Sequence, residues 1–205
     1  MRRLVLASSN PGKLREFRQM LGPLGIEVVP QAELGIADAD EPHETFVENA
    51  LAKARHASHC SGLPAFADDS GICVSALHGA PGVFSSRYAT AGAGGREEQD
   101  RRNNEKLIDQ LRDKNDRSAH YYCVIVLVRH AGDPEPLIAE GRWFGHVTAN
   151  PRGANGFGYD PYFLLPERGK TAAELAPGEK NAVSHRGRAL QGLVEMLRHA
   201  QNLAI

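Results

Sequence analysis

The sequence predicts an α/β protein with a mixed, twisted sheet, and three observations support that fold class. Short apolar segments alternate with amphipathic helical segments along the chain. The beginning has the pattern of a strand, a helix and a second strand, whereas two long strand patterns around residue 130 indicate a hairpin. The length of 205 residues fits a single domain, expected over residues 1–205.

The elements expected in the first half follow from the apolar spacing. A strand over 3–7, apolar throughout, leads through a polar turn over 8–13 into a helix that ends by Gly25. Asn10 followed by Pro11 has the pattern of a helix N-cap and a first-turn proline. The remaining elements are a strand over 26–29, an acidic loop over 38–44, a helix over 45–61 and two short strands over 65–67 and 72–77.

The second half is expected to begin with a turn over 79–82 and a mobile, Ala/Gly-rich surface loop over 89–95. A polar helix over 97–112 follows this loop. The strongest strand pattern covers 121–129, and its hairpin partner covers 136–148. A Gly-rich segment over 153–160 then leads to one last helix over 179–201.

Composition argues against several classes of protein. The formal net charge is −1, from 24 basic and 25 acidic residues, so we expect no nucleic acid as a partner. No apolar stretch is long enough to span a bilayer, and the run after Arg3 is too short for a signal peptide, so we expect no membrane partner. Cys60, Cys73 and Cys123 show no CxxC spacing and are expected to be small buried residues in a reducing cytoplasm.

The polar turn over 8–13 has the composition of an anion site. Unpaired N–H groups and the positive dipole end at a helix N-terminus favour a phosphate, and Lys13 adds a charge. The GxxxxGK[ST] pattern of a P-loop is absent from the sequence. Taken alone, an ordinary turn capped by Asn10 explains these residues better.

Two groups of carboxylates have the chemistry of a magnesium site. Asp68 and Asp69 are expected at the end of a buried strand, where two acids are costly to desolvate unless a cation meets them. Because neighbouring strand residues point to opposite sides, only one of the two is expected to face a given site. The second group lies in the acidic loop, where solvated side chains explain the pattern better in isolation. Its members are Asp38, Asp40, Glu41 and Glu44.

Two later segments have the composition of a binding site for a flat, charged ligand. Glycines around Phe157 permit close backbone approach and stacking of a base; a tight turn with one buried ring is the alternative. Lys180, His185 and Arg186 place donors at the beginning of the last helix, and a solvated first turn is the alternative there. The histidines of the second helix have no ligand spacing and are expected at the surface. They are His56 and His59.

Six segments, in this order, resemble the inosine triphosphate pyrophosphatase family, and the resemblance extends from residue 4 to about residue 197. The segments cover 7–13, 48–54, 67–71, 79–82, 156–161 and 184–186. The resemblance implies an elongated, two-lobed α/β domain with a central substrate cleft, usually in a homodimer. It also implies magnesium-dependent hydrolysis of ITP, dITP and XTP at the α-phosphorus, which gives the nucleoside monophosphate and pyrophosphate.

The resemblance also implies roles by position. Asp69 would activate the attacking water and, with Glu41, bind the metal, and Lys53 would be a catalytic lysine that reaches a phosphate. The residues implied to hold the triphosphate are Ser8, Ser9, Asn10, Pro11, Gly12 and Lys13. The residues implied to bind the rest of the nucleotide are Ser70, Phe157, Gly158, Tyr159, Asp160, Lys180, His185 and Arg186.

Some positions leave alternatives open. The family often has Thr-Gly-Asn where this chain has Ser8-Ser9-Asn10, and the loop over 89–95 is slightly extended. A donor that faces the purine 6-oxo group would reject adenine at a cost of roughly 1–3 kcal/mol, but no residue in the sequence indicates how guanine is rejected. The rival metal ligands are Asp40, Glu44 and Asp68.

Two other interpretations compete with this one. Maf-like nucleotide pyrophosphatases share the Leu-Ala-Ser opening, but typically continue with Ser-Pro-Arg-Arg where this chain has Asn-Pro-Gly-Lys over 10–13. A nucleotide-binding regulator without turnover would need the phosphate turn and Phe157 but no paired acids. The presence of Asp68, Asp69 and Lys53 together disfavours it.

Overall fold

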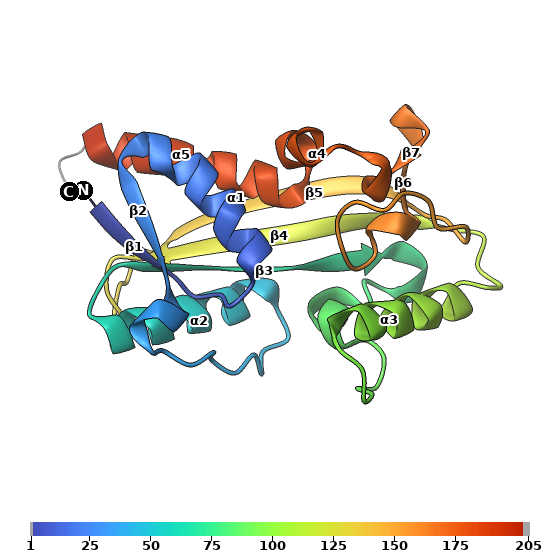
Figure 1. The fold of residues 1–205 in the computed structure, drawn as a ribbon, viewed down its shortest axis with the longest axis horizontal. Helices are drawn as coiled ribbons and strands as arrows, with labels where there is room; N and C mark the ends of the chain where they lie inside the picture. The colour runs from blue at the N-terminus through green and yellow to red at the C-terminus, as the bar shows by residue number, and fades with distance from the viewer. Residues whose placement is uncertain (1, 203–205) are drawn as a thin grey trace. The chain divides into compact units, whose positions relative to one another are not determined.

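The computed structural model describes residues 2–202, which form a seven-stranded mixed sheet with helices packed against it (Figure 1). The strand order is β2-β1-β3-β4-β5-β6-β7. β1 pairs in parallel with β2 and β3, whereas β6 pairs antiparallel with β5 and β7, so the predicted mixed α/β fold is confirmed. The strands are β1 (Arg2–Leu6), β2 (Ile26–Pro30), β3 (Ala65–Val74), β4 (Ser118–Val128), β5 (Leu137–Val147), β6 (Phe163–Leu165) and β7 (Lys170–Thr171).

The chain divides into two compact units. The first, called here the N-terminal unit, comprises Met1–Asp69, Cys123–Gly141 and Arg188–Ile205. The second, called here the central unit, comprises Ser70–Tyr122 and Arg142–Gly187. Because the boundaries fall inside β3, β4 and β5, these three strands contribute residues to both units. The implied substrate cleft between two lobes stays a prediction.

The N-terminal unit is built on the predicted β-α-β start. Helix α1 (Pro11–Leu21) joins β1 to β2, and α1 and α5 (His185–Asn202) cover one face of the strands, while α2 (Phe46–Ser61) covers the other (Figure 1). Phe17 of α1 meets Phe66 of β3 edge to face, with 4.9 Å between ring centroids. Burial of both faces explains why the strands of this unit are almost wholly apolar. No helix in residues 2–202 is long and apolar enough to cross a membrane.

The central unit has its own, more aromatic core. Helix α3 (Arg96–Gln110) contributes Leu107, and the strands contribute Tyr121, Trp143 and Phe163, whose rings pack against one another. Helix α4 (Pro177–Val183) follows a series of short 3-10 turns. The loop over 89–95 is largely exposed, as the sequence predicted, although Ala89 donates its N–H to Asn103 Oδ1 at 2.8 Å.

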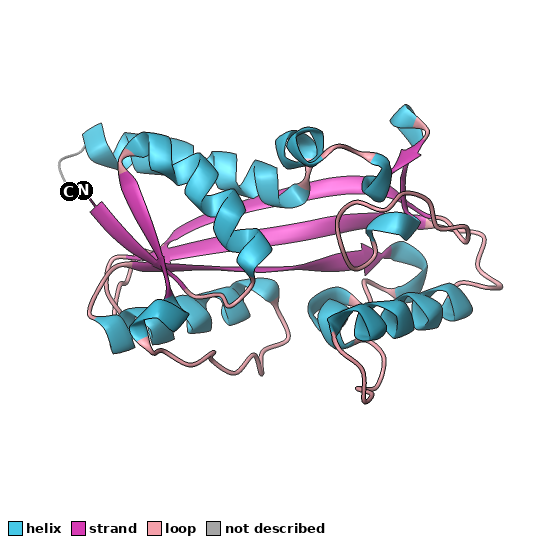
Figure 2. Cartoon of the chain, viewed as in Figure 1, coloured by secondary structure: helices cyan, strands magenta, loops and turns pink. Residues whose placement is uncertain are grey.

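Three sequence-based expectations are wrong. In place of the two strands expected over 65–67 and 72–77 there is one strand, β3, because cations meet the acids in its middle and Gly71 permits close packing. This strand ends at Val74, and Ser75–Leu77 forms a 3-10 turn. A Cβ on Gly71 would lie 2.4 Å from Gly82 O. The last helix is interrupted at Ser184, whose extended backbone separates α4 from α5 (Figure 2). Of the three cysteines expected to be buried, Cys60 is exposed, since it lies in the last turn of α2, and Cys73 is half-buried.

Candidate active site

The polar turn before α1 is a true helix cap. Asn10 has an extended backbone, and its Oδ1 accepts the N–H groups of Gly12 at 2.9 Å and Lys13 at 3.4 Å. Pro11 begins the helix, as predicted, and Ser8 Oγ accepts the Asn10 N–H at 3.2 Å. Two of the N–H groups expected to meet a phosphate are therefore occupied by the cap. The hydroxyl groups and the Lys13 ammonium remain the principal donors of this turn.

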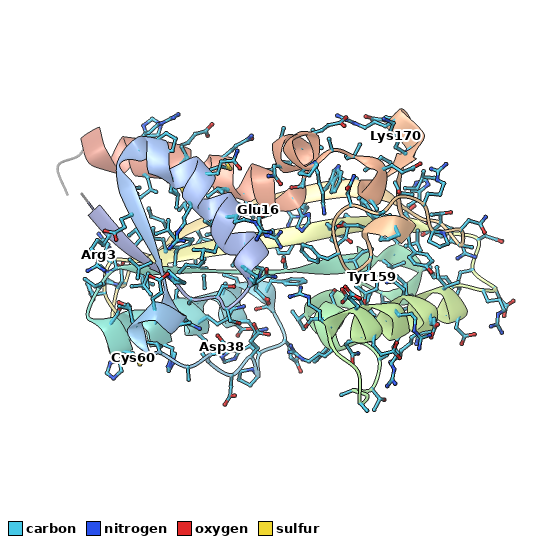
Figure 3. The ribbon with its side chains drawn as sticks, in the orientation of Figure 1. Arg3, Glu16, Asp38, Cys60, Tyr159 and Lys170 are labelled. Atoms are coloured by element: carbon cyan, nitrogen blue, oxygen red, sulfur yellow. The ribbon has the colours of Figure 1, made fainter. Side chains whose placement is uncertain are left out.

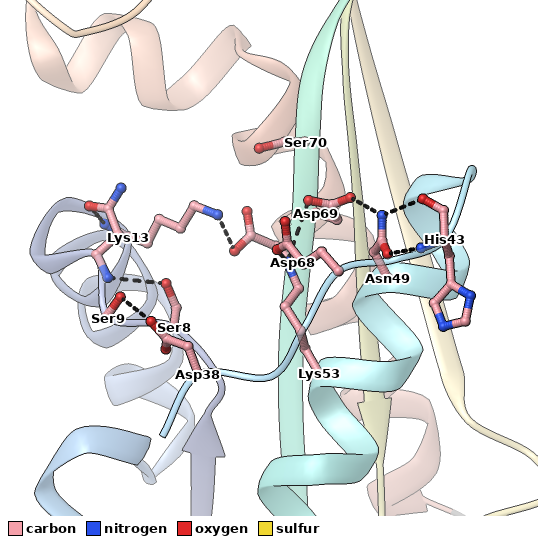
Figure 4. Close-up of polar contacts among 12 residues, drawn as sticks. Ser8, Ser9, Lys13, Asp38, His43, Asn49, Lys53, Asp68, Asp69 and Ser70 are labelled. Carbon is pink, nitrogen blue, oxygen red and sulfur yellow. Dashed lines mark hydrogen bonds and ion pairs between the residues drawn. The ribbon is translucent and has the colours of Figure 1, made fainter. Parts of the chain in front are cut away.

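Two lysines and three carboxylates of the N-terminal unit form ion pairs, and we call this set the acid-lysine cluster (Figure 4). Lys13 Nζ lies 2.9 Å from Asp68 Oδ1. Lys53 Nζ lies 2.6 Å from Glu41 Oε1 and 3.4 Å from Asp69 Oδ1. The cluster joins α1, α2, β3 and the acidic loop, which are distant in the sequence. It brings together three residues to which the resemblance assigns catalysis or metal binding.

Consecutive acids on β3 contact different lysines. Asp68 pairs with Lys13 of α1, whereas Asp69 pairs with Lys53 of α2, and these helices lie on opposite faces of the strands (Figures 1 and 4). Alternation along the strand explains this division. The prediction that the two acids serve different surroundings is confirmed, although they lie within the strand and not at its end.

Asn49 is a residue whose position the sequence indicated but whose role it did not. It is fully buried on α2, one turn before Lys53. Its Oδ1 accepts the His43 N–H at 3.0 Å, and its Nδ2 donates to His43 O at 3.1 Å and to Asp69 Oδ2 at 3.5 Å. One amide thus fixes the acidic loop next to Asp69. The sequence places Asn49 only within the segment 48–54 that carries the family resemblance and assigns it no role.

Burial and charge shift the pKa values within the cluster. Burial raises the pKa of Asp69 above 3.8, because the attraction of Lys53 does not offset it and Glu41 and Asp68 repel a further negative charge. Burial alone would lower the pKa of Lys53, but Asp69, Asp68 and Glu41 outweigh burial and raise it above 10.5. The cluster therefore holds more negative charge than its two lysines neutralise.

This donor set fits a hard divalent cation that also has substrate ligands. Residues 2–202 contain no group of three or more His, Cys, Asp or Glu side chains placed to hold a metal alone. Magnesium commonly takes one or two protein carboxylates and completes its shell with water and phosphate oxygens. Glu41 and Asp69 share one ammonium contact and supply such carboxylates.

The other residues of the acidic loop have different surroundings. Asp38 accepts a hydrogen bond from Ser9 Oγ at 3.0 Å and one from Gln31 Nε2 at 2.5 Å, so it is tied to the polar turn (Figures 3 and 4). Asp40 and Glu44 are exposed. Within this loop, the structure thus favours Glu41 over its neighbours as the residue that accompanies Asp69.

A second group of residues, all but Tyr121 predicted from the sequence, gathers in the central unit around Asp160. Asp160 is buried, accepts the Phe157 N–H at 2.9 Å through Oδ2 and forms an ion pair with Lys180. Gly156 has a φ of +81°, and a Cβ there would lie 2.0 Å from Asp160 Oδ2. The glycine next to Phe157 is therefore required by close approach and by backbone angle. We call this group the aromatic-basic cluster; its members are Tyr121, Phe157, Asp160, Lys180, His185 and Arg186.

Phe157 presents an exposed ring to several cations. Its relative exposure is 43%, and Lys180 Nζ lies 5.3 Å from its ring centroid. The guanidinium carbons of Arg96 and Arg186 lie at 5.3 Å and 5.9 Å. An exposed ring surrounded by cations suits a flat, anionic ligand. Arg96 was not singled out in the sequence, because nothing in the spacing of α3 sets it apart.

His185 and Arg186 begin α5 and are buried, so the alternative of a solvated first turn is wrong for them. The His185 ring stacks on Tyr121 with 4.6 Å between centroids and 8° between planes. Arg186 Nη2 donates to Ser70 Oγ at 3.2 Å. Ser70 directly follows Asp69 on β3. The same strand therefore carries Asp69 of the acid-lysine cluster and the hydrogen-bond partner of Arg186.

The loop with Phe157 is held by α3. Gly158 donates its N–H to Asp100 Oδ2 at 3.0 Å and accepts from Asn104 Nδ2 at 2.9 Å. Tyr159 points into the core of the central unit, where its hydroxyl donates to Ser85 O at 2.8 Å (Figure 3). Its side chain thus supports the loop from within. Sequence analysis missed Asp100 and Asn104, which carry no motif.

Comparisons with known proteins find similar chains along almost the whole sequence. Residues 4–196 match the Ham1 family. The dITP/XTP pyrophosphatase of Ralstonia nicotianae is 64% identical over 98% of this chain and 100% of its own length. That of Nitrosomonas europaea is 60% identical over 100% of this chain and 98% of its own.

Solved structures extend the likeness to the fold. A HAM1 protein from Coxiella burnetii shares 50% identity at a TM-score of 0.91, with 97% of this chain and 100% of that chain covered. The resemblance inferred from the six sequence segments is therefore confirmed. With a family match along almost its entire length, the chain belongs to the Ham1 family.

Proposed function

We propose that this chain is a nucleoside triphosphate pyrophosphatase that hydrolyses ITP, dITP and XTP and so removes them from the nucleotide pool. The observation that carries the proposal is the acid-lysine cluster, in which a buried Asp69 lies within reach of Lys53 and beside Glu41. The relatives from Ralstonia nicotianae and Nitrosomonas europaea, at 64% and 60% identity, are named dITP/XTP pyrophosphatases and support the choice of substrates.

In this proposal Asp69 acts as the general base. It takes a proton from a water molecule whose oxygen forms a bond to the α-phosphorus, while the bond from that phosphorus to the bridging oxygen breaks. The products are the nucleoside monophosphate and pyrophosphate. A carboxylate whose pKa is raised by burial is a stronger base than an exposed one, which suits this task.

The lysines offset charge that grows on the leaving group. Lys53 would contact a phosphate, and Lys13 and the hydroxyls of Ser8 and Ser9 would hold the triphosphate. Glu41 and Asp69 would hold magnesium, which when bound neutralises phosphate charge and polarises the reacting phosphorus. Fixed cations of this kind act on every triphosphate, since they contact the part that all substrates share.

Base choice falls to the aromatic-basic cluster in this proposal. Phe157 would stack on the purine, and Lys180, His185 and Arg186 would direct donors to its edge. Hypoxanthine and xanthine present a 6-oxo acceptor to such donors. Adenine presents an amino group there, and the unpaired donor would cost roughly 1–3 kcal/mol.

The proposal extends to assembly and location. We propose a homodimer, supported by exposed aromatic side chains of the central unit: Phe84 is 52% exposed and Phe144 is 66% exposed. We also propose a cytoplasmic enzyme, supported by three free cysteines, and a small-molecule substrate as the only partner besides its own copy.

The experiment that tests the activity uses the purified chain, magnesium and five nucleotides separately: ITP, XTP, dITP, GTP and ATP. Pyrophosphate, orthophosphate and the monophosphate are measured together. We expect pyrophosphate and monophosphate, released much faster from ITP, dITP and XTP than from GTP or ATP. Orthophosphate would move the cleavage away from the α-phosphorus. No product from any of the five would contradict the proposal and favour a Maf-like or non-catalytic nucleotide-binding protein.

A further inference from the structure

Tyr121 contacts both His185 and Asp160 of the aromatic-basic cluster, although no motif includes it. It lies on β4, and its ring stacks on His185 at 4.6 Å and 8°. Its hydroxyl donates to Asp160 Oδ1 at 3.3 Å. The other oxygen of Asp160 accepts the Phe157 N–H and pairs with Lys180. One side chain therefore connects the histidine at the start of α5 with the loop that carries the exposed phenylalanine.

We propose that Tyr121 is a positioning residue for base selection: its ring fixes the plane of His185, and its hydroxyl fixes Asp160 and so the loop of Phe157. The inference rests on the function proposed above. It adds a residue that acts through others, because Tyr121 is buried, with 7% relative exposure, and its ring and hydroxyl contact His185 and Asp160.

The surroundings of Tyr121 make the alignment rigid. Phe163 packs against its ring at 4.7 Å, and Trp143 lies in a nearly parallel plane, 6.3 Å from Tyr121 and 6.4 Å from His185. Aromatic pairs in such geometries contribute roughly 0.5–1.5 kcal/mol beyond their buried area. A His185 ring held in this way points its nitrogens in a fixed direction, which a donor to one edge of a purine requires.

The hydroxyl remains a donor throughout the working range of pH. Burial, with the nearby charge of Asp160 adding to it, raises the pKa of Tyr121 well above 10. Its proton is therefore available to Asp160, which already accepts bonds from Phe157 and Lys180. Loss of this third donor would leave the carboxylate less firmly oriented while the ion pair remains.

Two variants separate the parts of this role. Tyr121→Phe keeps the ring and removes the hydroxyl, whereas Tyr121→Leu removes the stacking partner of His185. Phe17→Leu is the control, since Phe17 is a fully buried ring of the N-terminal unit that pairs with Phe66 and lies outside the aromatic-basic cluster. Each variant is assayed for kcat and KM with ITP and ATP, for inhibition by inorganic pyrophosphate, and for Tm.

We expect Tyr121→Leu to lower the ITP-to-ATP ratio of kcat/KM roughly fivefold to tenfold, the change that loss of an aromatic pair produces. Tyr121→Phe should raise the KM for ITP about threefold with kcat nearly unchanged, because only orientation is lost. Inhibition by pyrophosphate should not change in either variant, since phosphates are bound elsewhere. Phe17→Leu should lower Tm without changing the ratio.

The outcomes distinguish the two proposals. A wild-type chain that does not prefer ITP to ATP overturns the proposed function before any variant is compared. A wild-type preference for ITP that Tyr121→Leu retains, or that Phe17→Leu reduces equally, overturns the positioning role alone. Should Tyr121→Leu not fold, Tyr121→Phe decides: an unchanged KM for ITP contradicts the role of the hydroxyl.

Discussion

The acid-lysine cluster and the aromatic-basic cluster are built from different interactions. The first consists of three carboxylates and two lysines, held by ion pairs at 2.6–3.4 Å and by a buried amide. The second consists of stacked rings, one buried ion pair and an exposed ring among cations. Charges act on the phosphates that every nucleoside triphosphate shares, whereas rings and directed donors meet only the base. Variants of the first should thus change the rate for all substrates, and variants of the second should change the choice among them.

The largest effect is expected from Asp69→Asn. The amide keeps the shape of the side chain but cannot take a proton, so kcat should fall roughly 10³-fold for ITP and for poorer substrates alike. Nucleotide binding, measured by calorimetry, should remain close to wild type. Asp113→Asn, an exposed acid on the surface of the central unit, is the control and should leave kcat unchanged. Near-normal turnover by Asp69→Asn would show that another group is the base.

Lys53→Met should have the second largest effect on kcat and should also lower the stability of the folded protein. Removal of the ammonium leaves Glu41 and Asp69 without their shared cation, which should lower kcat about 10²-fold and unfolding free energy by about 3 kcal/mol. Urea unfolding and steady-state kinetics measure both changes. Lys114→Met, an exposed lysine, is the control. A change in kcat for ITP that ATP does not share would contradict the separation of the two clusters.

Phe157→Leu tests the aromatic-basic cluster. Loss of a stacking ring commonly costs roughly 1–3 kcal/mol per base, so the KM for ITP should rise about tenfold or more while kcat changes little. Binding of inorganic pyrophosphate should not change. Phe144→Leu is a matched control, because Phe144 is also an exposed ring of the central unit but lies outside the cluster. Equal effects of the two substitutions would argue against stacking on Phe157.

The smallest effect concerns the folding stability associated with Asp69 in metal-free buffer. Because burial raises its pKa above 3.8, the folded state binds a proton more tightly than the unfolded state. The stability gained from this proton is present below pH 3.8 and is lost as the pH rises through the raised value. Asp69→Asn, always neutral, should therefore be more stable than wild type at pH 7, and the difference should shrink on acidification. A constant difference between pH 3 and pH 7 would contradict the raised pKa.

Local patterns in the sequence sufficed wherever one segment determines its own structure. The cap by Asn10 and the proline after it follow from backbone donors that lie within the same turn. The β-α-β start follows from apolar spacing over about three elements. The six motifs contain most members of the two clusters, since each motif keeps its residues within a few positions of one another.

Local patterns do not reveal contacts between segments that are distant in the sequence. The sequence predicts that the acids of β3 end a strand, because nothing near them in sequence shows that Lys13 and Lys53 meet their charges. The interruption at Ser184 is not predicted, because residues 179–186 contain no proline or glycine that would signal the end of a helix. Tyr121 and Asn104 lie in unremarkable strand and helix patterns, and only the folded chain brings them to His185 and to Gly158.

The continuity of β3 determines which changes of sequence this strand tolerates. Asp68, Asp69 and Ser70 occupy consecutive positions, and side chains alternate between the two faces of a strand. Substitutions along β3 alter one side chain at a time. Deletion or insertion of one residue between Phe66 and Asp68 would instead turn each acid toward the lysine of the other and shift Ser70 from Arg186. We therefore expect this stretch to tolerate exchanges of residue type far better than any change in its length.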